Sequence, residues 1–425
     1  MADIRRASEG SAKPEPRASE ARAGADKYMG YGPLTELMGG YGNPWMVMPP
    51  VARDIADSRL ADMRARALVS RARHERYRLY LCSRYGVRLR ALSMISGRID
   101  MRADAEVPTS IQCEVVSDEG LMDVDWASAR IQAAMEIRLE DGSWGEWPLG
   151  VFLPSTPSYR TTATGTTLSI EGYDQTVILR EDRVLSPVVI PKGERYADAI
   201  LGQINQAGIY TVLMDDLDAV LPADVTYDMG TSRLEIVNSL LTAVNYQAVF
   251  ANGAGALICR REYLPYERQV DHLYMDDHLS VLAPELGTDM DAFDVPNVIQ
   301  AVVSRAEGEP LTAQWINDDP ASKLSVANRG RRVVRIDQLA DALDEAALTA
   351  YVRMEGYKTL AIVGSVSFAT APMPDHGVGD MVFLRIFADK DDGPGASGRY
   401  LETGYSMELS PGASMTHTAE KVVIL

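Results

Sequence analysis

Residues 131–153, IQAAMEIRLEDGSWGEWPLGVFL, decide the fold class of this chain. Every second residue of the first half is apolar: Ile131, Ala133, Met135, Ile137 and Leu139. A period of two is typical of a β-strand with one buried face. The run ends in Glu140-Asp141-Gly142, a turn signal, and a second apolar run, residues 148–153, follows it. The stretch therefore predicts paired antiparallel strands.

The same pattern continues on both sides of this stretch. Tyr77, Leu79 and Leu81 alternate with more polar residues, residues 161–167 have the composition of a hairpin tip, and a further strand begins near Leu168. Short strands separated by regular turns indicate an antiparallel barrel or sandwich. We assign this first β domain to residues 76–185.

Residues 186–265 mix helical and strand signals. A helix from Tyr196 is closed by Gly208, and a strand is expected over residues 209–213. Ser232 and Glu235 have the spacing of a capping box at the start of a second helix. Two short strands flank the turn at residues 252–255. We interpret this region as a small α+β module.

Residues 266–425 return to a β-rich pattern, with one helix predicted over residues 338–353 because Ala and Leu are frequent there. Four stretches in this segment are expected to be strands: residues 297–303, 366–368, 381–387 and 400–409.

The N-terminal residues differ from the rest of the chain. Residues 1–49 are predicted to be an extended arm, because residues 1–27 lack large apolar side chains and residues 28–50 are rich in Gly and Pro. The arm carries five candidate side chains for docking on a partner: Tyr28, Tyr31, Tyr41, Trp45 and Met46. Residues 50–75 are predicted to form a basic amphipathic helix or linker.

Charge is unevenly distributed along the 425 residues. Residues 1–90 carry a net charge of +7, and residues 91–425 carry −25. A body this acidic does not favour tight DNA binding, which requires clustered cations. No apolar run approaches the length of a membrane span, and no secretory signal begins the chain, so we predict a protein made in a cytoplasm without membrane binding. The three separated cysteines, Cys82, Cys113 and Cys259, are expected to be small buried hydrophobes.

Two segments hold candidate metal ligands. Asp271, His272, Asp276, Asp277 and His278 form the densest cluster. The two histidines are six positions apart, no third ligand pair is evident, and the stretch has the look of a linker. Residues 389–393, DKDDG, place Gly one position too early for a calcium loop of the EF-hand type. We expect neither a metal nor another cofactor.

Sequence signatures of catalysis are also missing. The chain contains no G-x-S-x-G, no phosphate-binding loop of the Walker type and no H-E-x-x-H, and only five histidines. A carboxylate pair for glycoside cleavage stays open, since 60 acidic residues make chance pairs unavoidable. We predict no enzyme activity and assign no catalytic residues.

Three stretches together resemble the hub family of phage tails and defective prophages, which includes the baseplate hub of T-even phages and hub proteins of Gram-positive phages. They are residues 147–157 (WPLGVFLPSTP), residues 168–174 (LSIEGYD), and Ile178-Leu179 followed by Asp182. Similarity continues downstream at Ala199-Ile200-Leu201, Gly208-Ile209, residues 232–246, residues 294–298, residues 330–332 and residues 379–382.

The resemblance implies a mainly β fold, in which two tube-type antiparallel β-barrels (residues 76–185 and 266–425) flank the α+β module. It implies a homotrimer that forms a pseudo-sixfold ring at the tip or baseplate of a virion tail or of a contractile injection particle, two settings that the sequence does not separate. Its partners would be the tail tube or a distal tail protein, a spike, fibre or tape-measure protein, and genomic DNA only in passage. A receptor- or glycan-binding tail-tip protein and a cell-wall hydrolase remain the alternatives.

Overall fold

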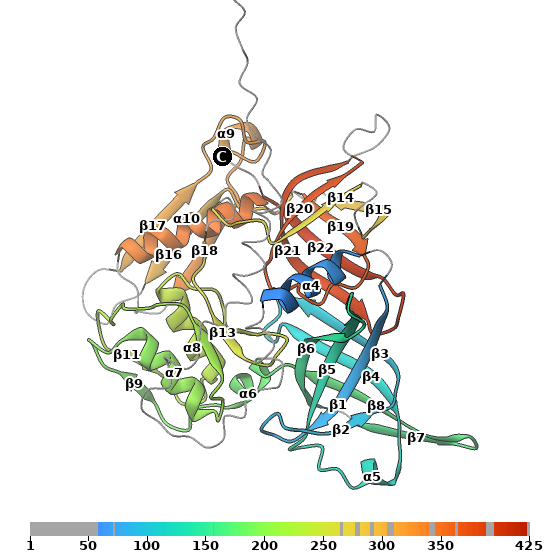
Figure 1. The fold of residues 1–425 in the computed structure, drawn as a ribbon. Helices are drawn as coiled ribbons and strands as arrows, with labels where there is room; N and C mark the ends of the chain where they lie inside the picture. The colour runs from blue at the N-terminus through green and yellow to red at the C-terminus, as the bar shows by residue number, and fades with distance from the viewer. Residues whose placement is uncertain are drawn as a thin grey trace, which may run out of the picture. The chain divides into compact units, whose positions relative to one another are not determined.

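The computed structural model describes residues 58–70, 73–155, 157–263, 267–276, 281–289, 293–303, 310–339, 345–361, 364–387 and 395–422. Residues Asp62–Leu425 form one compact unit (Figure 1). No helix in these ranges is both long and apolar enough to cross a membrane.

The N-terminal part of this unit is built of β-strands. Its elements are α4 (Ser58–Val69), β1 (Glu75–Cys82), β2 (Arg88–Leu92), β3 (Met94–Arg102), β4 (Thr109–Val116), α5 (Glu119–Met122), β5 (Arg130–Arg138), β6 (Trp144–Pro154), β7 (Ser158–Thr162) and β8 (Gly165–Tyr173).

These strands form a curled antiparallel sheet. The order of pairing is β3-β4-β8-β6-β5-β1-β2, so β2 and β3 lie at opposite ends of the path. Only Ser93 separates them in the sequence, so the sheet must bend back on itself. Its interior is apolar, with Leu79, Ile131, Met135 and Phe152 fully buried. The positions that alternate in β5 are buried as predicted, but Gln132 and Ala134 are buried too, so the middle of this strand is covered on both faces.

The middle of the chain is the α+β module expected from the sequence. Its elements are α6 (Thr176–Glu181), β9 (Val188–Ile190), α7 (Tyr196–Gln206), β10 (Val212–Met214), β11 (Val225–Tyr227), α8 (Arg233–Ala243), β12 (Phe250–Ala251) and β13 (Leu257–Cys259).

Several sequence signals in this region predicted the ends of its helices correctly. Ser232 caps α8, because its hydroxyl oxygen accepts from the backbone N–H of Glu235 at 3.1 Å. Gly208 follows α7 with φ +84°, a conformation that favours glycine. The strand expected over residues 209–213 is shorter and later, because β10 pairs in parallel with β13 only over residues 212–214.

The C-terminal part contains β14 (His272–Met275), β15 (Leu282–Asp289), β16 (Val298–Val303), β17 (Leu311–Ile316), α9 (Val326–Arg329), β18 (Val334–Leu339), α10 (Glu345–Ala361), β19 (Ser365–Thr370), β20 (Met381–Ile386), β21 (Ala396–Glu408) and β22 (Met415–Lys421).

Six of these strands form a second curled sheet, in the order β15-β19-β22-β21-β20-β14. Tyr274 of β14 and Phe368 of β19 belong to strands far apart in this order, yet their ring centroids are 5.7 Å apart. The sheet therefore closes over its own inner face. Of the five pairings between these strands, four are antiparallel and that of β14 with β20 is parallel.

Strand β21 joins the two curled sheets. Its last residues pair with β3, from Gly404 opposite Arg102 to Glu408 opposite Arg98. In the described residues, fourteen strands thus belong to one hydrogen-bonded sheet. The chain is mainly β with large antiparallel sheets and few helices, which confirms the predicted fold class.

The helix predicted over residues 338–353 was placed too early. Residues up to Leu339 belong to β18, which pairs in parallel with β16, and α10 spans Glu345–Ala361. The alternation of exposed and half-buried residues in β18 includes Val334, Ile336 and Gln338. At the end of this strand, pairing with β16 outweighs the helix propensity of the residues that follow.

The division of the chain into two barrels and a module stays a prediction. The structure adds that β16, β17 and β18 form a separate three-stranded sheet, against which α10 packs. Ala301 and Val303 of β16 and Leu348 and Val352 of α10 belong to the same apolar core as the α+β module.

The packing of α10 on β17 depends on Gly356. A Cβ at this position would lie 2.3 Å from the indole of Trp315. We expect Gly356→Ala to lower the free energy of unfolding by about 1–3 kcal/mol, because overpacking forces side chains out of their rotamers. Urea denaturation of the full chain measures this change.

Gly202 of α7 provides the matched control, because a Cβ there would meet no atom within 4 Å. Gly202→Ala should raise the free energy of unfolding by up to about 1 kcal/mol. Equal effects of the two substitutions would contradict the packing argument.

Candidate functional site

The inner face of the second curled sheet carries a cluster of titratable side chains, which we call the His–Glu cluster. Its members come from β14, β19, β21, β22 and the loop between β19 and β20: His272, Tyr274, Thr370, His376, Asp380, Glu402 and His417. Glu402 and His417 are 0% exposed, so the cluster lies in the protein interior.

Glu402 is the centre of this cluster. Nδ1 of His376 lies 2.5 Å from one carboxylate oxygen, and Nδ1 of His417 lies 2.5 Å from the other. Burial would raise the pKa of Glu402, but the charges and hydrogen bonds of the two imidazoles lower it to about 2. The two imidazoles therefore favour the ionised form of this buried carboxylate.

The outer nitrogens of the two imidazoles have hydroxyl partners. Nε2 of His376 lies 2.7 Å from the Tyr274 hydroxyl, and Nε2 of His417 lies 2.8 Å from Oγ1 of Thr370. The Thr370 hydroxyl also donates to the backbone carbonyl of Ala371 at 2.8 Å. Both rings are thereby held by two contacts each.

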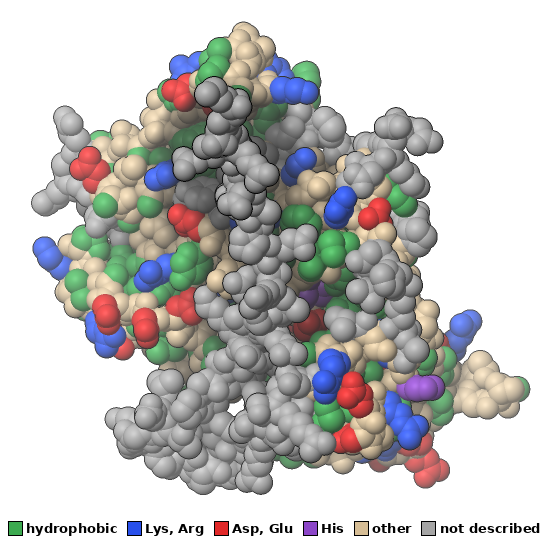
Figure 2. Space-filling model, turned by 45° about the horizontal axis from the view of Figure 1, so that its top comes forward, with side chains coloured by type: hydrophobic (Ala, Val, Ile, Leu, Met, Phe, Trp, Pro, Cys, Tyr) green, Lys and Arg blue, Asp and Glu red, His purple; other side chains and the backbone are tan. Residues whose placement is uncertain are grey.

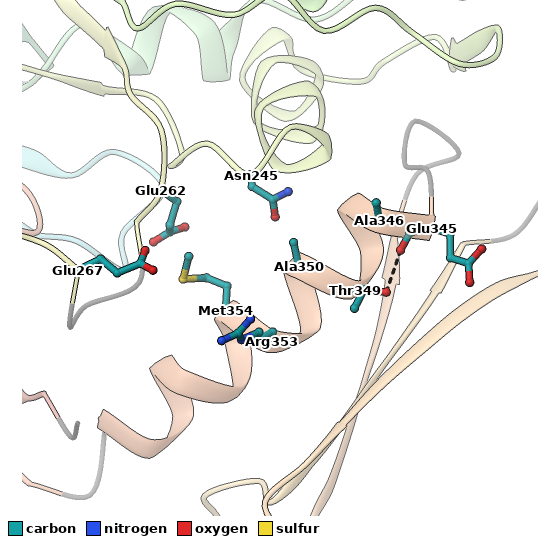
Figure 3. Close-up of a pocket in the computed structure, with 9 residues that line it drawn as sticks. All are labelled: Asn245, Glu262, Glu267, Glu345, Ala346, Thr349, Ala350, Arg353 and Met354. Atoms are coloured by element: carbon teal, nitrogen blue, oxygen red, sulfur yellow. Dashed lines mark hydrogen bonds between the residues drawn. The ribbon is translucent and has the colours of Figure 1, made fainter. Parts of the chain in front are cut away.

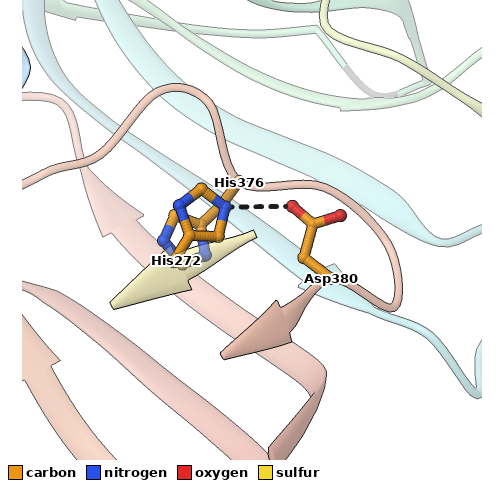
Figure 4. Close-up of side chains that lie close together, drawn as sticks. All are labelled: His272, His376 and Asp380. Carbon is orange, nitrogen blue, oxygen red and sulfur yellow. Dashed lines mark hydrogen bonds and ion pairs between the residues drawn. The ribbon is translucent and has the colours of Figure 1, made fainter. Parts of the chain in front are cut away.

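His272 and Asp380 form a second layer of the cluster (Figure 4). Nε2 of His272 lies 3.2 Å from the Asp380 carboxylate, and its ring stacks on that of His376 with centroids 3.7 Å apart. Burial lowers the pKa of His272, but Asp380 and Asp375 raise it to about 9. Asp380 also accepts from the backbone N–H of Gly377 at 2.7 Å, which fixes the loop.

The structure changes the interpretation of residues 271–278. The segment expected to be a linker contains β14, whose ends are held against β20 by two carboxylates. Asp271 accepts from the backbone N–H of Met381, and Asp276 accepts from that of Phe387, each at 2.8 Å. Asp277 and His278 lie outside the described residues.

Sequence reasoning missed His376, Glu402 and His417. A signal was present for the last of these, because His417 occupies an inward position between Met415 and Ala419 on an alternating strand. A polar residue at such a position indicates a buried partner. Nothing local shows which partner it has.

The five arm residues singled out from the sequence, Tyr28, Tyr31, Tyr41, Trp45 and Met46, lie outside the described residues, as do residues 389–393 of the calcium-like loop. The cysteines are buried free thiols, as predicted, and burial raises the pKa of Cys113 to about 12.

A pocket of about 780 Å³ lies beside α10 (Figure 3). It is lined by Asn245, Glu262, Glu267, Glu345, Ala346, Thr349, Ala350, Arg353 and Met354. Three carboxylates and one guanidinium give it an acidic lining. Its single hydroxyl, that of Thr349, donates to the Glu345 carbonyl at 2.8 Å, so the lining offers no nucleophile paired with a base.

Several residues that carry the family resemblance are buried and make contacts that stabilise the fold. Phe152 of β6 is fully buried, and Trp147 lies under the Arg64 guanidinium at 5.3 Å. Asp174 is 2% exposed and accepts from the backbone N–H groups of Thr109 and Thr176, at 2.7 and 2.8 Å. It therefore joins the start of β4 to the start of α6.

Solved structures of tail proteins share this fold. A tail protein from Neisseria meningitidis MC58 superposes with a TM-score of 0.56 over 81% of this chain and 97% of that chain, at 12% identity. The 43 kDa tail protein of prophage MuSo2 from Shewanella oneidensis superposes with a TM-score of 0.56 over 82% and 98%, at 9% identity.

No family model and no curated protein matches the chain. At these identities the structural match establishes the fold alone. The chain has the fold of phage tail proteins, as the resemblance in its sequence implied.

Asp174→Asn tests the role of the Asp174 carboxylate. In this variant, the amide NH₂ would face a backbone N–H that now donates to the carboxylate. We therefore expect the free energy of unfolding to fall by about 1–3 kcal/mol. Urea denaturation measures the loss. Asp228→Asn, at an exposed position, should change it by less than about 0.5 kcal/mol. A loss of unfolding free energy no larger than that of the control would show that Asp174 is already protonated or that its carboxylate does not stabilise the fold.

Proposed function

We propose that this chain is a structural hub of a phage-type tail, in which three copies form a pseudo-sixfold ring. The observation that carries the proposal is the presence of two curled β-sheets in one chain, joined through β21 and β3, in a fold shared with tail proteins. The ring would join the tail tube to the tip or spike and continue the DNA channel.

Two curled sheets per chain make a sixfold arrangement possible with three chains. The strand order of the large sheet ends at β2 and at β15, and edge strands present backbone groups that can pair with another chain. Leu89 on β2 is 62% exposed, which favours an apolar contact at this edge. Contacts between unlike edges of neighbouring copies close a ring when the rotation allows it.

The acid excess of residues 91–425 suits a channel through which DNA passes without binding, because like charges repel phosphates. On the face shown in Figure 2, acidic and basic side chains are interspersed over the described residues. We propose that the acidic bore is formed by a part of the chain that this view does not show.

We further propose that the hub has no catalysis of its own and acts by shape. Its partners would be the tail tube or distal tail protein on one side and the spike, fibre or tape-measure protein on the other. It would reside at the tip of the virion tail.

The mass of the purified chain in solution tests the ring. Light scattering after gel filtration should give about three times the chain mass of 46.5 kDa. Leu89→Lys should shift the chain toward monomers, since a charge would be buried at the proposed edge contact. A wild-type monomer or hexamer, in solution and in reconstructed particles, would contradict the trimer.

Val189 of β9 is the matched control for this substitution, because it is also an aliphatic strand residue and is 58% exposed. Val189→Lys should leave the mass unchanged. Equal loss of trimer with both variants would show that added charge, and not the β2 edge, is responsible.

The arm, residues 1–49, is proposed to dock on a neighbouring tail protein through Tyr28, Tyr31, Tyr41, Trp45 and Met46. Deletion of residues 1–50 should leave the circular dichroism spectrum and thermal unfolding of the remaining chain intact, because Asp62–Leu425 is a compact unit by itself. Incorporation into particles should fall at least tenfold. Normal incorporation of the truncated chain would refute the docking role.

A further inference from the structure

We propose that the His–Glu cluster holds one divalent transition-metal ion of the Zn²⁺ class. The donor atoms would be the two carboxylate oxygens of Glu402 and Nδ1 of both His376 and His417. This inference is independent of the proposed hub function, and it departs from the expectation, drawn from the sequence, that the chain has no metal site.

The hydrogens around His417 do not suffice for all of its contacts when the ring is neutral. Thr370 has one hydroxyl hydrogen, and it is donated to the Ala371 carbonyl. The direction of the 2.8 Å contact between Oγ1 of Thr370 and Nε2 of His417 depends on the tautomer of the imidazole, and when Thr370 donates to Ala371, Oγ1 accepts and Nε2 is the donor. In a neutral imidazole this leaves a lone pair on Nδ1, directed at a Glu402 oxygen 2.5 Å away.

Two acceptors cannot face each other at that distance unless a cation lies between them. An additional proton on Nδ1 would make His417 an imidazolium. A metal ion would instead lie between the two acceptor atoms and could bind further side chains at the same time. The second imidazole, His376, directs the same atom, Nδ1, at the other oxygen of Glu402 at 2.5 Å. This symmetric arrangement favours a single ion shared by all three side chains.

The buried carboxylate of Glu402 also requires a compensating positive charge. Within the described residues, the ion-pair partners of Glu402 are His376 and His417, and neither a Lys nor an Arg pairs with it. If both imidazoles are neutral, a full negative charge remains at a fully buried position, which is costly without compensation. The other buried carboxylate, Asp380, is paired with His272 and does not help.

The donor set suits zinc. Zn²⁺ binds imidazole nitrogen and carboxylate oxygen at about 2.0–2.2 Å, usually with four donor atoms. Tetrahedral bonds of that length put a nitrogen donor and an oxygen donor roughly 3.3 Å apart, whereas the two oxygens of one carboxylate stay closer together because their covalent geometry is fixed. The present spacing of 2.5 Å between Nδ1 and carboxylate oxygen would have to open by less than about 1 Å, which small side-chain rotations supply.

The surroundings have the form that metal-bound imidazoles require. Histidine ligands generally donate their second N–H to an oxygen, which fixes the ring and its tautomer. Tyr274 and Thr370 provide that oxygen for His376 and His417, at 2.7 and 2.8 Å. The stacked ring of His272 covers His376 and excludes water from that side.

Metal analysis of the full-length chain tests the proposal. Because the cluster is buried, the ion must enter during folding, so the chain should be produced in medium supplemented with Zn²⁺ and then passed through metal-free buffer. Mass spectrometry of the metal content should give about one zinc per chain. Production with Co²⁺ should give visible d–d absorption bands of a site with nitrogen and oxygen ligands.

Matched variants locate the ion. His417→Gln and Glu402→Gln should reduce the bound metal to background, whereas His74→Gln, at an exposed histidine outside the cluster, should retain it. If the ligand variants fail to fold, Thr370→Val provides the second test, because it keeps the shape and removes only the oxygen that accepts from His417. Competition with a chromophoric chelator should then show about 10–100-fold weaker binding.

Two results would overturn the proposal. One is a wild-type chain that carries no stoichiometric metal after production with either Zn²⁺ or Co²⁺, which would mean that a proton occupies the cluster. The other is a folded His417→Gln variant that keeps its metal, which would place the ion elsewhere.

Discussion

Strand β21 is the constraint on which the rest of the structure depends. Its first half pairs with β20, its second half pairs with β3, and β22 runs along its other edge. Where it passes β3, Gly404 approaches so closely that a Cβ would lie 2.9 Å from the Met101 carbonyl oxygen. One strand thereby links two curled sheets that are distant in the sequence, and the geometry of each depends on the other.

The two sheets fill their interiors by different physical means. The first is closed over aliphatic and aromatic side chains, where burial of apolar surface provides the driving force. The second contains a fully buried carboxylate between imidazoles, and such a network stabilises a fold only if every polar group has a partner. A bound cation would meet this condition and would connect β21, β22 and the loop after β19 at one point.

The proposed hub function depends on the apolar interior of the first sheet, and the proposed metal site depends on the polar interior of the second. If the chain is a hub that acts by shape, its sheets must keep their curvature while neighbouring proteins bind and DNA passes. An apolar interior supplies rigidity through close packing. A metal at the centre of the other sheet would supply it through a few directional bonds, and it would account for the buried polar groups there.

The sequence alone determined those features of the fold that depend on residues close together in the chain. The alternation of Ile131 to Leu139, the turn at Asp141-Gly142, the cap at Ser232 and the glycine at 208 each express a preference of a few consecutive residues. These signals predicted the β-rich class, the α+β module and most strands, and the ordered stretches resembling tail hubs predicted the fold.

Only the tertiary structure decided which distant residues meet. His272 and His417 are 145 positions apart and reach the same interior because a six-stranded sheet curls over them. The local pattern around each shows burial at most, since a strand's periodicity specifies its inner face but not its partners across the interior. For the same reason the start of α10 was misplaced, because the pairing of β18 with β16 is a long-range contact that helix propensity does not contain.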